Sequence, residues 1–299
     1  MNVAVLAGGH NSEHEVSLSS AKSIMAALAD LGHVAQTFDV SPSLPQELAG
    51  FAPDVVFNAL HGPGVEDGGI QGFLDVLQYP YTHSGVRSSA IAMDKKLTKL
   101  MLAETEIDVA ADKIIDPATL FEADPLPRPY VLKALNEGSS VSVVIITDED
   151  PQPLSADDDG PWHHYDALLA EEFIPGQEIA VAVLDGKALG VIELRPHEGF
   201  YDYRAKYTDG VTDHIMPADI PASVADKACR DAEVAHIALE CRGVTRSDFR
   251  YDPDTGRLVF LEINTQPGMT TLSLVPEIAA YAGISFPKLI SALLDGARS

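Results

Sequence analysis

Cysteine and basic residues are both scarce in this 299-residue chain. Only two cysteines, Cys229 and Cys241, are present. They are too few for a disulfide framework or for a zinc site of four cysteines, and they fit a reducing compartment. Lys and Arg total 20 against 45 Asp and Glu, which gives a formal net charge of -25. A field of this sign repels phosphate backbones and anionic membranes, so we expect no nucleic acid or membrane partner.

Long hydrophobic runs are also missing. The longest uncharged stretch, residues 263–276, is interrupted by Gln266-Pro267-Gly268. No segment therefore approaches the roughly 18 apolar residues that span a membrane. The first residues carry no basic region, and their apolar run stops at Gly8, unlike a secretion signal. We expect a cytoplasmic protein, whose 46% hydrophobic content is sufficient for a substantial core.

Alternating strand and helix patterns predict a parallel sheet in the first part of the chain. Residues 2–7 are typical of a short buried strand, and Gly8-Gly9 predicts a turn after it. Helical spacing follows over residues 16–31 and ends at Gly32. Strands at 34–40 and 54–59 and a helix at 70–77 complete an α/β unit that closes near residue 85.

The remainder of the chain predicts helices combined with hairpins. The expected elements are an amphipathic helix at 88–103, short strands at 114–115, 130–133 and 141–147, a hairpin of 179–184 and 189–193 around Asp185-Gly186, a helix at 222–239, and a hairpin of 244–251 and 258–264. The segment 148–162 is rich in Pro, Asp and Gly and is interpreted as a solvated loop.

The last hairpin carries a notable group of polar side chains. Strand alternation places Arg246 and Asp248 on one face of its first strand. Glu262 and Asn264 share a face of its second strand. If the register aligns Asp248 with Glu262, the two carboxylates lie roughly 5 Å apart and need an arginine or a metal between them. Two interpretations stay open: an ion-pair ladder that uses Arg246 and Arg250, and a Mg²⁺ site of carboxylate and amide oxygens.

Three lysines lie beside turns in this acidic chain. Lys133 ends a strand and precedes a Gly/Ser-rich loop, 134–142, whose N–H groups could cradle phosphate oxygens. An ordinary hairpin turn has the same composition, and the loop lacks the Walker A ending. Lys206 lies in the polar, aromatic segment 200–207, interpreted as a loop or lid. Lys95 follows Met93-Asp94, where a solvated helix face is the plain alternative.

A zinc-peptidase pattern competes near the start of the chain. His10, Glu13 and His14 match the H-x-x-E-H spacing of inverted zinc peptidases. Zinc would need both histidines on one helix face, whereas Gly8-Gly9 places His10 in a turn. We therefore expect loop contacts, not zinc, for these two histidines.

An ordered series of short strings resembles the D-alanine:D-alanine ligases of the ATP-grasp superfamily along nearly the whole chain. The strings are Ala7-Gly8-Gly9, Ser12-Glu13, Glu15-Val16-Ser17, Leu60-His61-Gly62, Glu66-Asp67-Gly68, Tyr81-Thr82, Ser84-Gly85-Val86, Met93-Asp94-Lys95, Glu137-Gly138-Ser139-Ser140-Val141, Tyr201-Asp202-Tyr203, Ala205-Lys206-Tyr207, Glu262, Asn264-Thr265, Pro267-Gly268-Met269-Thr270 and Ser273-Leu274-Val275-Pro276. Each string is weak alone, but their order is specific. It favours the metal and phosphate interpretations over the ion-pair ladder, the ordinary hairpin turn and the solvated helix face.

This resemblance implies an α/β fold with α+β lobes, namely an ATP-grasp fold preceded by a Rossmann-like N-terminal α/β domain. The implied domains are 1–86 on the substrate side, 87–170 as the central lobe, and 171–299 as the C-terminal lobe with the metal site. The implied reaction joins two D-alanines through a D-alanyl phosphate for peptidoglycan precursor synthesis. It implies ATP and two Mg²⁺ ions, with Mn²⁺ as a substitute, and base rates favour a homodimer.

The resemblance also implies a role for individual residues. For the nucleotide these are Lys95 and Lys133 on the α- and β-phosphates, Lys206 on the γ-phosphate, Glu171, Glu172, Phe173 and Ile174 around adenine, and Glu178 on the ribose. The implied metal ligands are Asp248, Glu262 and Asn264.

The implied amino-acid side has its own residues. Glu13 would pair with the first ammonium and Ser273 with the second carboxylate. Arg246 and the N–H of Gly268 would stabilise the tetrahedral oxyanion. Ser139 and Tyr207 would link the flap and the lid to Glu13, so that closure excludes water.

Three departures from the family pattern keep alternatives open. Ala134 replaces a proline after the strand lysine, and Ser142 replaces a glycine at the end of the flap. These two changes allow a non-catalytic nucleotide-binding relative. Leu272 stands before Ser273 where some members carry histidine, so a ligase that accepts D-lactate or D-serine is a further alternative.

Overall fold

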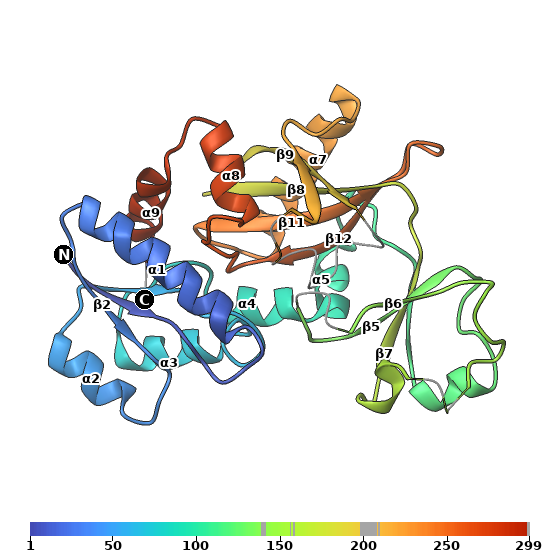
Figure 1. Cartoon of the computed structure of the whole chain (residues 1–299), viewed down its shortest axis with the longest axis horizontal. Coiled ribbons are helices and arrows are strands. Elements are labelled where there is room, and N and C mark those ends of the chain that lie inside the picture. The colour runs from blue at the N-terminus through green and yellow to red at the C-terminus, as the bar shows by residue number, and fades with distance from the viewer. Residues whose placement is uncertain (139–141, 156, 158, 198–207, 209, 298–299) are drawn as a thin grey trace.

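The computed structural model has three β-sheets within its described residues (Figure 1). It describes residues 1–138, 142–155, 157, 159–197, 208 and 210–297. The first sheet is parallel, with β1 (Asn2–Leu6) between β2 (Val34–Phe38) and β3 (Val55–Asn58). Helices α1 (His14–Asp30), α2 (Leu44–Phe51) and α3 (Gly69–Leu77) flank it. The predicted α/β opening is confirmed.

The helix expected at 88–103 is wrong as a single element. The structure has two helices, α4 (Val86–Met93) and α5 (Lys95–Leu102), which are separated at Asp94. Asp94 has an extended backbone, and its side chain accepts hydrogen bonds from the N–H groups of Lys96 and Leu97, each at 2.9 Å. This is an N-cap, so the aspartate ends one helix and starts the next.

The second sheet is antiparallel and has the order β4-β7-β5-β6. Its strands are β4 (Asp112–Ile115), β5 (Tyr130–Ala134), β6 (Val144–Ile146) and β7 (Leu168–Glu172), and it carries the 3-10 turns η1 (Pro117–Phe121) and η2 (Pro161–His163). The interpretation of 148–162 as wholly solvated is wrong. Leu154 and Trp162 are buried against Leu120 and Tyr130 because this small sheet needs an apolar cover.

The third sheet has five strands in the order β10-β9-β8-β11-β12. The strands are β8 (Gln177–Leu184), β9 (Lys187–Pro196), β10 (Thr212–Ile215), β11 (Val244–Tyr251) and β12 (Leu258–Asn264). Both predicted hairpins are confirmed. Asp185-Gly186 turns the first with positive φ at both residues, as two-residue hairpin turns require.

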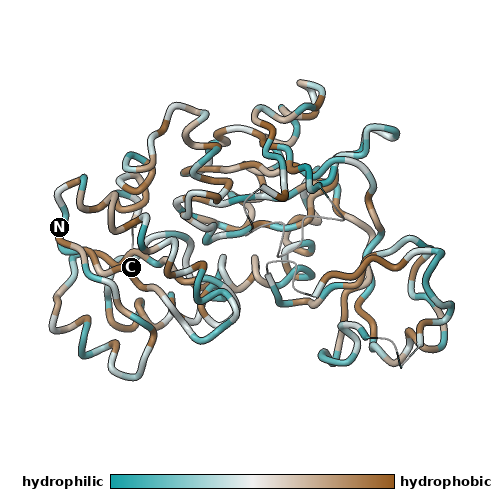
Figure 2. The backbone as a smooth tube through the Cα atoms, in the orientation of Figure 1, coloured by the Kyte–Doolittle hydropathy of each residue, from teal (hydrophilic) through white to brown (hydrophobic). Residues whose placement is uncertain are grey.

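Strand alternation gives the third sheet two buried faces. Ile179 and Val181 pack with α7 (Ala222–Ala238), whereas Ala180 and Ala182 pack with α8 (Leu274–Tyr281). Hydrophobic residues along the strands of this sheet are brown in Figure 2.

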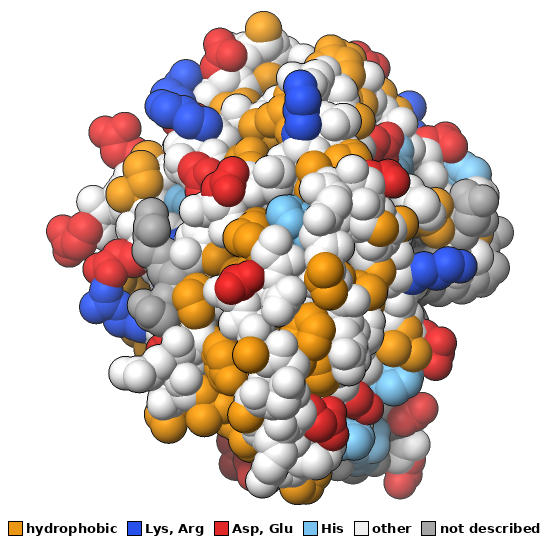
Figure 3. All heavy atoms as spheres, turned by 90° about the vertical axis from the view of Figure 1, so that its left-hand side faces the viewer, with side chains coloured by type: hydrophobic (Ala, Val, Ile, Leu, Met, Phe, Trp, Pro, Cys, Tyr) orange, Lys and Arg blue, Asp and Glu red, His pale blue; other side chains and the backbone are white. Residues whose placement is uncertain are grey.

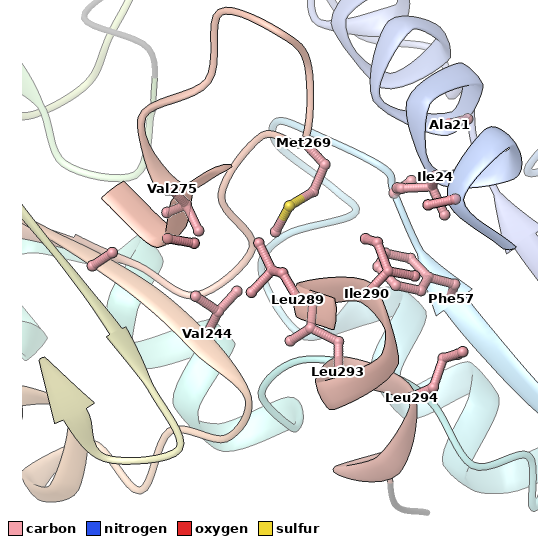
Figure 4. Close-up of a cluster of buried hydrophobic side chains, with 14 of the residues drawn as sticks. Ala21, Ile24, Phe57, Val244, Met269, Val275, Leu289, Ile290, Leu293 and Leu294 are labelled. Carbon is pink, nitrogen blue, oxygen red and sulfur yellow. The ribbon is translucent and has the colours of Figure 1, made fainter. Parts of the chain in front are cut away.

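The helix α9 (Phe286–Asp295) joins the third sheet to the first (Figure 4). Leu289 and Ile290 are fully buried in one core cluster with Ile24 of α1 and Phe57 of β3. The first unit is thus completed by residues from the other end of the sequence.

The surface reflects the acidic composition. Figure 3 shows the face that carries the first sheet, where acidic side chains outnumber basic ones. Within the described ranges, no single helix is long and apolar enough to cross a membrane, although α8 and α9 pass that test as a pair bent by 104°.

Candidate active site

A cavity lies where segments from the parts of the chain that carry the three sheets meet. Its walls come from the start of α1, the junction of α4 and α5, the loop after β5, strands β11 and β12, and the loop before α8. The predicted site residues that line it are Glu13, Lys95, Arg246, Glu262, Asn264, Gly268 and Ser273. Segments far apart in the sequence therefore converge on one place, which is typical of a binding site.

The register of β11 and β12 brings the four predicted polar residues together. Asp248 lies opposite Glu262, which is the register that the sequence left open, and Arg246 lies opposite Asn264. Arg246 donates two hydrogen bonds to Asp248, at 2.7 Å and 2.8 Å. This pair is largely buried, so the arginine neutralises Asp248 inside the protein and not as part of a surface ladder. Arg250 instead pairs with Glu178 at 3.4 Å.

Oxygen donors on these strands suit a hard cation such as Mg²⁺. Glu262 and Asn264 both line the cavity. Lys95 Nζ lies 4.0 Å from Glu262 Oε2, and Asn264 Oδ1 accepts a hydrogen bond from Gln266 N at 2.7 Å. The described residues contain no group of three or more His, Cys, Asp or Glu that could hold a metal ion. Magnesium here would therefore rely on two acids, the amide and oxygens of a bound phosphate.

A buried charge cluster lies on the second sheet and α5. The carboxylate of Glu171 forms ion pairs with Lys133 through one oxygen and with Lys99 through the other. Burial alone would raise the pKa of Glu171, but the two ammonium groups hold it at about 2. Burial would likewise lower the pKa of Lys133, yet Glu171 and the more distant Glu262 and Glu178 raise it. Both groups are therefore charged at neutral pH.

The residues expected around adenine follow Glu171 at the end of β7. Glu172 accepts a hydrogen bond from Arg257 at 2.8 Å. Ile174 is buried against Val259, and its carbonyl accepts from Arg250 Nε at 3.1 Å. Phe173 between them is half-buried. The adenine role of residues 171–174 stays a prediction.

The residues expected on the amino-acid side, Glu13, Gly268 and Ser273, all line the cavity. Glu13 is 5% exposed and immediately precedes α1. Ser273 precedes α8, and its Oγ accepts a hydrogen bond from Thr270 N at 2.9 Å. A methyl group on Gly268 would lie 2.8 Å from Ser273 Oγ, so glycine keeps this backbone close to the hydroxyl.

Three predicted residues, Ser139, Lys206 and Tyr207, lie outside the described residues. The end of the flap is described at Ser142, whose Oγ donates to Glu137 Oε2 at 2.8 Å and lies 2.6 Å from Tyr165 Oη. Lys95 Nζ donates to the carbonyl of Glu137 at 2.5 Å. The serine that replaces the usual glycine is therefore integrated into the flap.

Two residues of the cavity wall, His61 and Glu66, were not predicted from the sequence. His61 is 3% exposed, and its ring nitrogens lie 3.1 Å from Glu66 Oε1 and 3.0 Å from Ser20 Oγ. His61 and Glu66 both line the cavity. Their strings were visible, but only the fold shows that they face the same space as Glu13.

The histidines of the zinc-peptidase pattern have separate environments. His10 is exposed, whereas His14 begins α1 and its Nδ1 lies 2.8 Å from the carbonyl of Gly9. Glu13 between them lines the cavity.

Comparisons with known proteins agree on one family. A family model described as "D-ala D-ala ligase C-terminus" matches residues 116–295. The D-alanine–D-alanine ligase of Rhizorhabdus wittichii is 51% identical over 301 residues, which cover 99% of this chain and 96% of that protein. The crystal structure of the Bacillus anthracis ligase has a TM-score of 0.84 at 31% identity and covers 99% of this chain and 97% of its own. Its complex with ATP has a TM-score of 0.81 at 27% identity, with the same coverage of both chains.

Proposed function

Because the chain belongs to the D-alanine–D-alanine ligase family, we propose that it joins two D-alanine molecules in a reaction that consumes ATP. The family also confirms the predicted fold class, an ATP-grasp fold preceded by an α/β domain. The γ-phosphoryl group passes to the carboxylate of the first D-alanine and leaves ADP. The amine of the second D-alanine then attacks the acyl carbon, loses a proton and displaces phosphate. The product is D-alanyl-D-alanine for peptidoglycan precursors.

The observation that carries this proposal is the shared cavity. It joins Glu13 and Ser273, which suit an ammonium and a carboxylate, to Lys95, Glu262 and Asn264, which suit a phosphate and its metal. Both halves of the reaction thus have chemically matched groups within one space. Phosphoryl transfer depends chiefly on such positioning and on charge neutralisation.

Within this proposal each basic group has a defined task. Lys95 and Lys133 bind the α- and β-phosphates, and Lys206 binds the γ-phosphate. Arg246 and the N–H of Gly268 stabilise the negative oxygen formed when the amine attacks. Asp248, Glu262 and Asn264 hold Mg²⁺, which when bound neutralises charge on the phosphates.

The adenine end and the moving segments complete the proposed site. Glu171, Glu172, Phe173 and Ile174 surround adenine, and Glu178 binds the ribose. Ser139 and Tyr207 connect the flap and the lid to Glu13, which closes the site to water.

The proposal extends to organisation and location. We place the lobe boundaries near residues 86 and 170, the enzyme in the cytoplasm, and the assembled form as a homodimer, the commonest symmetric state.

The test measures phosphate release from Mg-ATP with single D-amino acids and with pairs, and identifies the product by mass. We expect phosphate release to require D-alanine and a dipeptide to form. Chelation of the divalent cation should abolish phosphate release, and added Mg²⁺ or Mn²⁺ should restore it. D-lactate and D-serine serve as alternative acceptors because Leu272, 40% exposed, lies in the cavity wall before Ser273. Nucleotide binding without D-alanine-dependent phosphate release would contradict the proposal.

A further inference from the structure

Lys99 is a buried lysine that does not line the cavity. It lies one turn after Lys95 on α5 and is 6% exposed. Its ammonium donates to the carbonyl of Ala110 at 2.9 Å and lies 3.8 Å from Asp112 Oδ1. Together with the ion pair to Glu171, these contacts give the ammonium three oxygen partners. A buried lysine held in this way cannot extend toward a ligand.

Lys99 and Lys133 share one carboxylate, but in the proposed function only Lys133 also binds a phosphate. Glu171 is 2% exposed and offers Oε1 to Lys99 and Oε2 to Lys133. In the proposed function Lys133 binds a phosphate, so nucleotide binding would draw its ammonium from Glu171 toward that anion. Lys99 then remains as the fixed countercharge of Glu171. Without Lys99, and with Lys133 engaged by the phosphate, the carboxylate would be buried with neither ammonium partner, which is costly enough to favour its protonation.

The protonation state of Glu171 matters for recognition of the base. An ionised carboxylate only accepts hydrogen bonds, whereas a protonated one also donates. Adenine presents an exocyclic amino donor at C6, and hypoxanthine presents a carbonyl acceptor at the same atom. An ionised Glu171 therefore favours adenine, and a neutral Glu171 loses that preference.

We propose that Lys99 is a positioning residue that holds the Glu171 carboxylate as an acceptor for the 6-amino group of the nucleotide and thereby sets the preference for adenine. The inference rests on the proposed function, since it takes residues 171–174 as the adenine pocket. It assigns Lys99 no contact with substrate.

The experiment compares Lys99→Met with the wild type in steady-state kinetics with Mg-ATP and Mg-ITP at saturating D-alanine. We expect the ratio of kcat/KM for ATP to that for ITP to fall at least about tenfold, because a mismatched buried polar group carries discrimination of this order or more. The KM for D-alanine should stay within about twofold, because Lys99 is not among the residues that line the cavity. Lys99→Arg, which keeps the charge, should restore most of the ratio.

The matched control is Lys96→Met. Lys96 lies on the same helix and pairs with Asp112 at 2.8 Å, but its described contacts do not include Glu171. This variant should keep the wild-type ratio. If Lys99→Met and Lys96→Met change the ratio equally, the proposed specificity of Lys99 is wrong.

A second variant, Glu171→Gln, tests the inference if Lys99→Met does not fold. Glu171→Gln places an amide that can donate as well as accept, so it should lower the same ratio, and adding Lys99→Arg should not change that result. If Glu171→Gln keeps the wild-type ratio, the inference is overturned. If the wild type releases no phosphate with D-alanine, the proposed function fails first, and binding of Mg-ADP against Mg-IDP by calorimetry still tests the role of Lys99.

Discussion

His83 is an unusual residue for its position and should make the stability of the protein sensitive to pH. Its backbone has φ 72°, in the left-handed region that favours glycine, and its side chain is buried beside the ring of Phe57. Nδ1 lies 2.9 Å from Thr82 Oγ1, whereas Nε2 has no hydrogen-bond partner among the described residues. Burial first, and then the nearby His61, lower the pKa of His83 to about 3.

The size of the effect follows from proton linkage. The folded pKa lies below the unfolded value of 6.5, so between these limits the unfolded chain binds a proton that the folded chain does not. The free energy of unfolding therefore falls as the pH drops below 6.5 and levels off near the folded pKa. From pH 7 to pH 5 the loss is about 2 kcal/mol. A folded pKa one unit higher would scarcely change this figure, because the folded imidazole is neutral at pH 5 in either case.

The variant His83→Asn isolates this contribution. Asparagine tolerates positive φ and does not titrate, so the backbone conformation is kept while the proton site is removed. Urea unfolding of both proteins at pH 7 and pH 5 should show that the wild type loses about 2 kcal/mol more than the variant between these pH values. His164→Asn, at an exposed site, is the control. An equal pH dependence of wild type and His83→Asn would refute the assignment of a buried, neutral imidazole.

Three further changes test the site directly. Gly268→Ala should raise the KM for D-alanine about tenfold or more, because the new methyl group would lie 2.8 Å from Ser273 Oγ. Gly50→Ala, whose methyl group would enter open space, should leave this KM unchanged, and equal KM values for the two variants would contradict the role of Gly268. Ser142→Ala removes two hydrogen bonds from the flap, each worth about 1 kcal/mol, so the KM for ATP should rise by up to about thirtyfold in initial-rate assays. An unchanged KM would show that the serine does not order the flap for nucleotide. Lys206→Ala should reduce kcat by about a hundredfold or more while the melting temperature stays constant, and parallel losses would speak against a lid role.

Local patterns were sufficient for the elements that depend on near neighbours. The hairpins at Asp185-Gly186 and at 244–251 and 258–264 follow from turn chemistry and strand alternation, and both are confirmed. Alternation alone did not fix the register, and the structure shows that Asp248 lies opposite Glu262. The break at Asp94 was missed because its apolar neighbours continue the helical period, although an aspartate before a helix is itself a capping signal.

Long-range contacts account for what the sequence did not reveal. Trp162 is buried only because the fold brings Leu120 and Tyr130 against it. Lys99 pairs with Glu171 only because the fold brings β7 beside α5. His61 lines the cavity only because the fold brings β12 and the start of α8 to the same place. Such neighbours carry no fixed spacing along the chain, so periodicity cannot predict them.

The position of α9 has a consequence for biosynthesis. Residues near position 290 fill the core beneath β3, which was synthesised more than two hundred residues earlier. During translation the opening α/β unit therefore remains without part of its interior until α9 has emerged from the ribosome, even though domains generally fold in the order of their synthesis. Its apolar surface at Ile24 and Phe57 stays exposed over that interval. We therefore expect chaperones to bind a nascent chain that is stalled before α9.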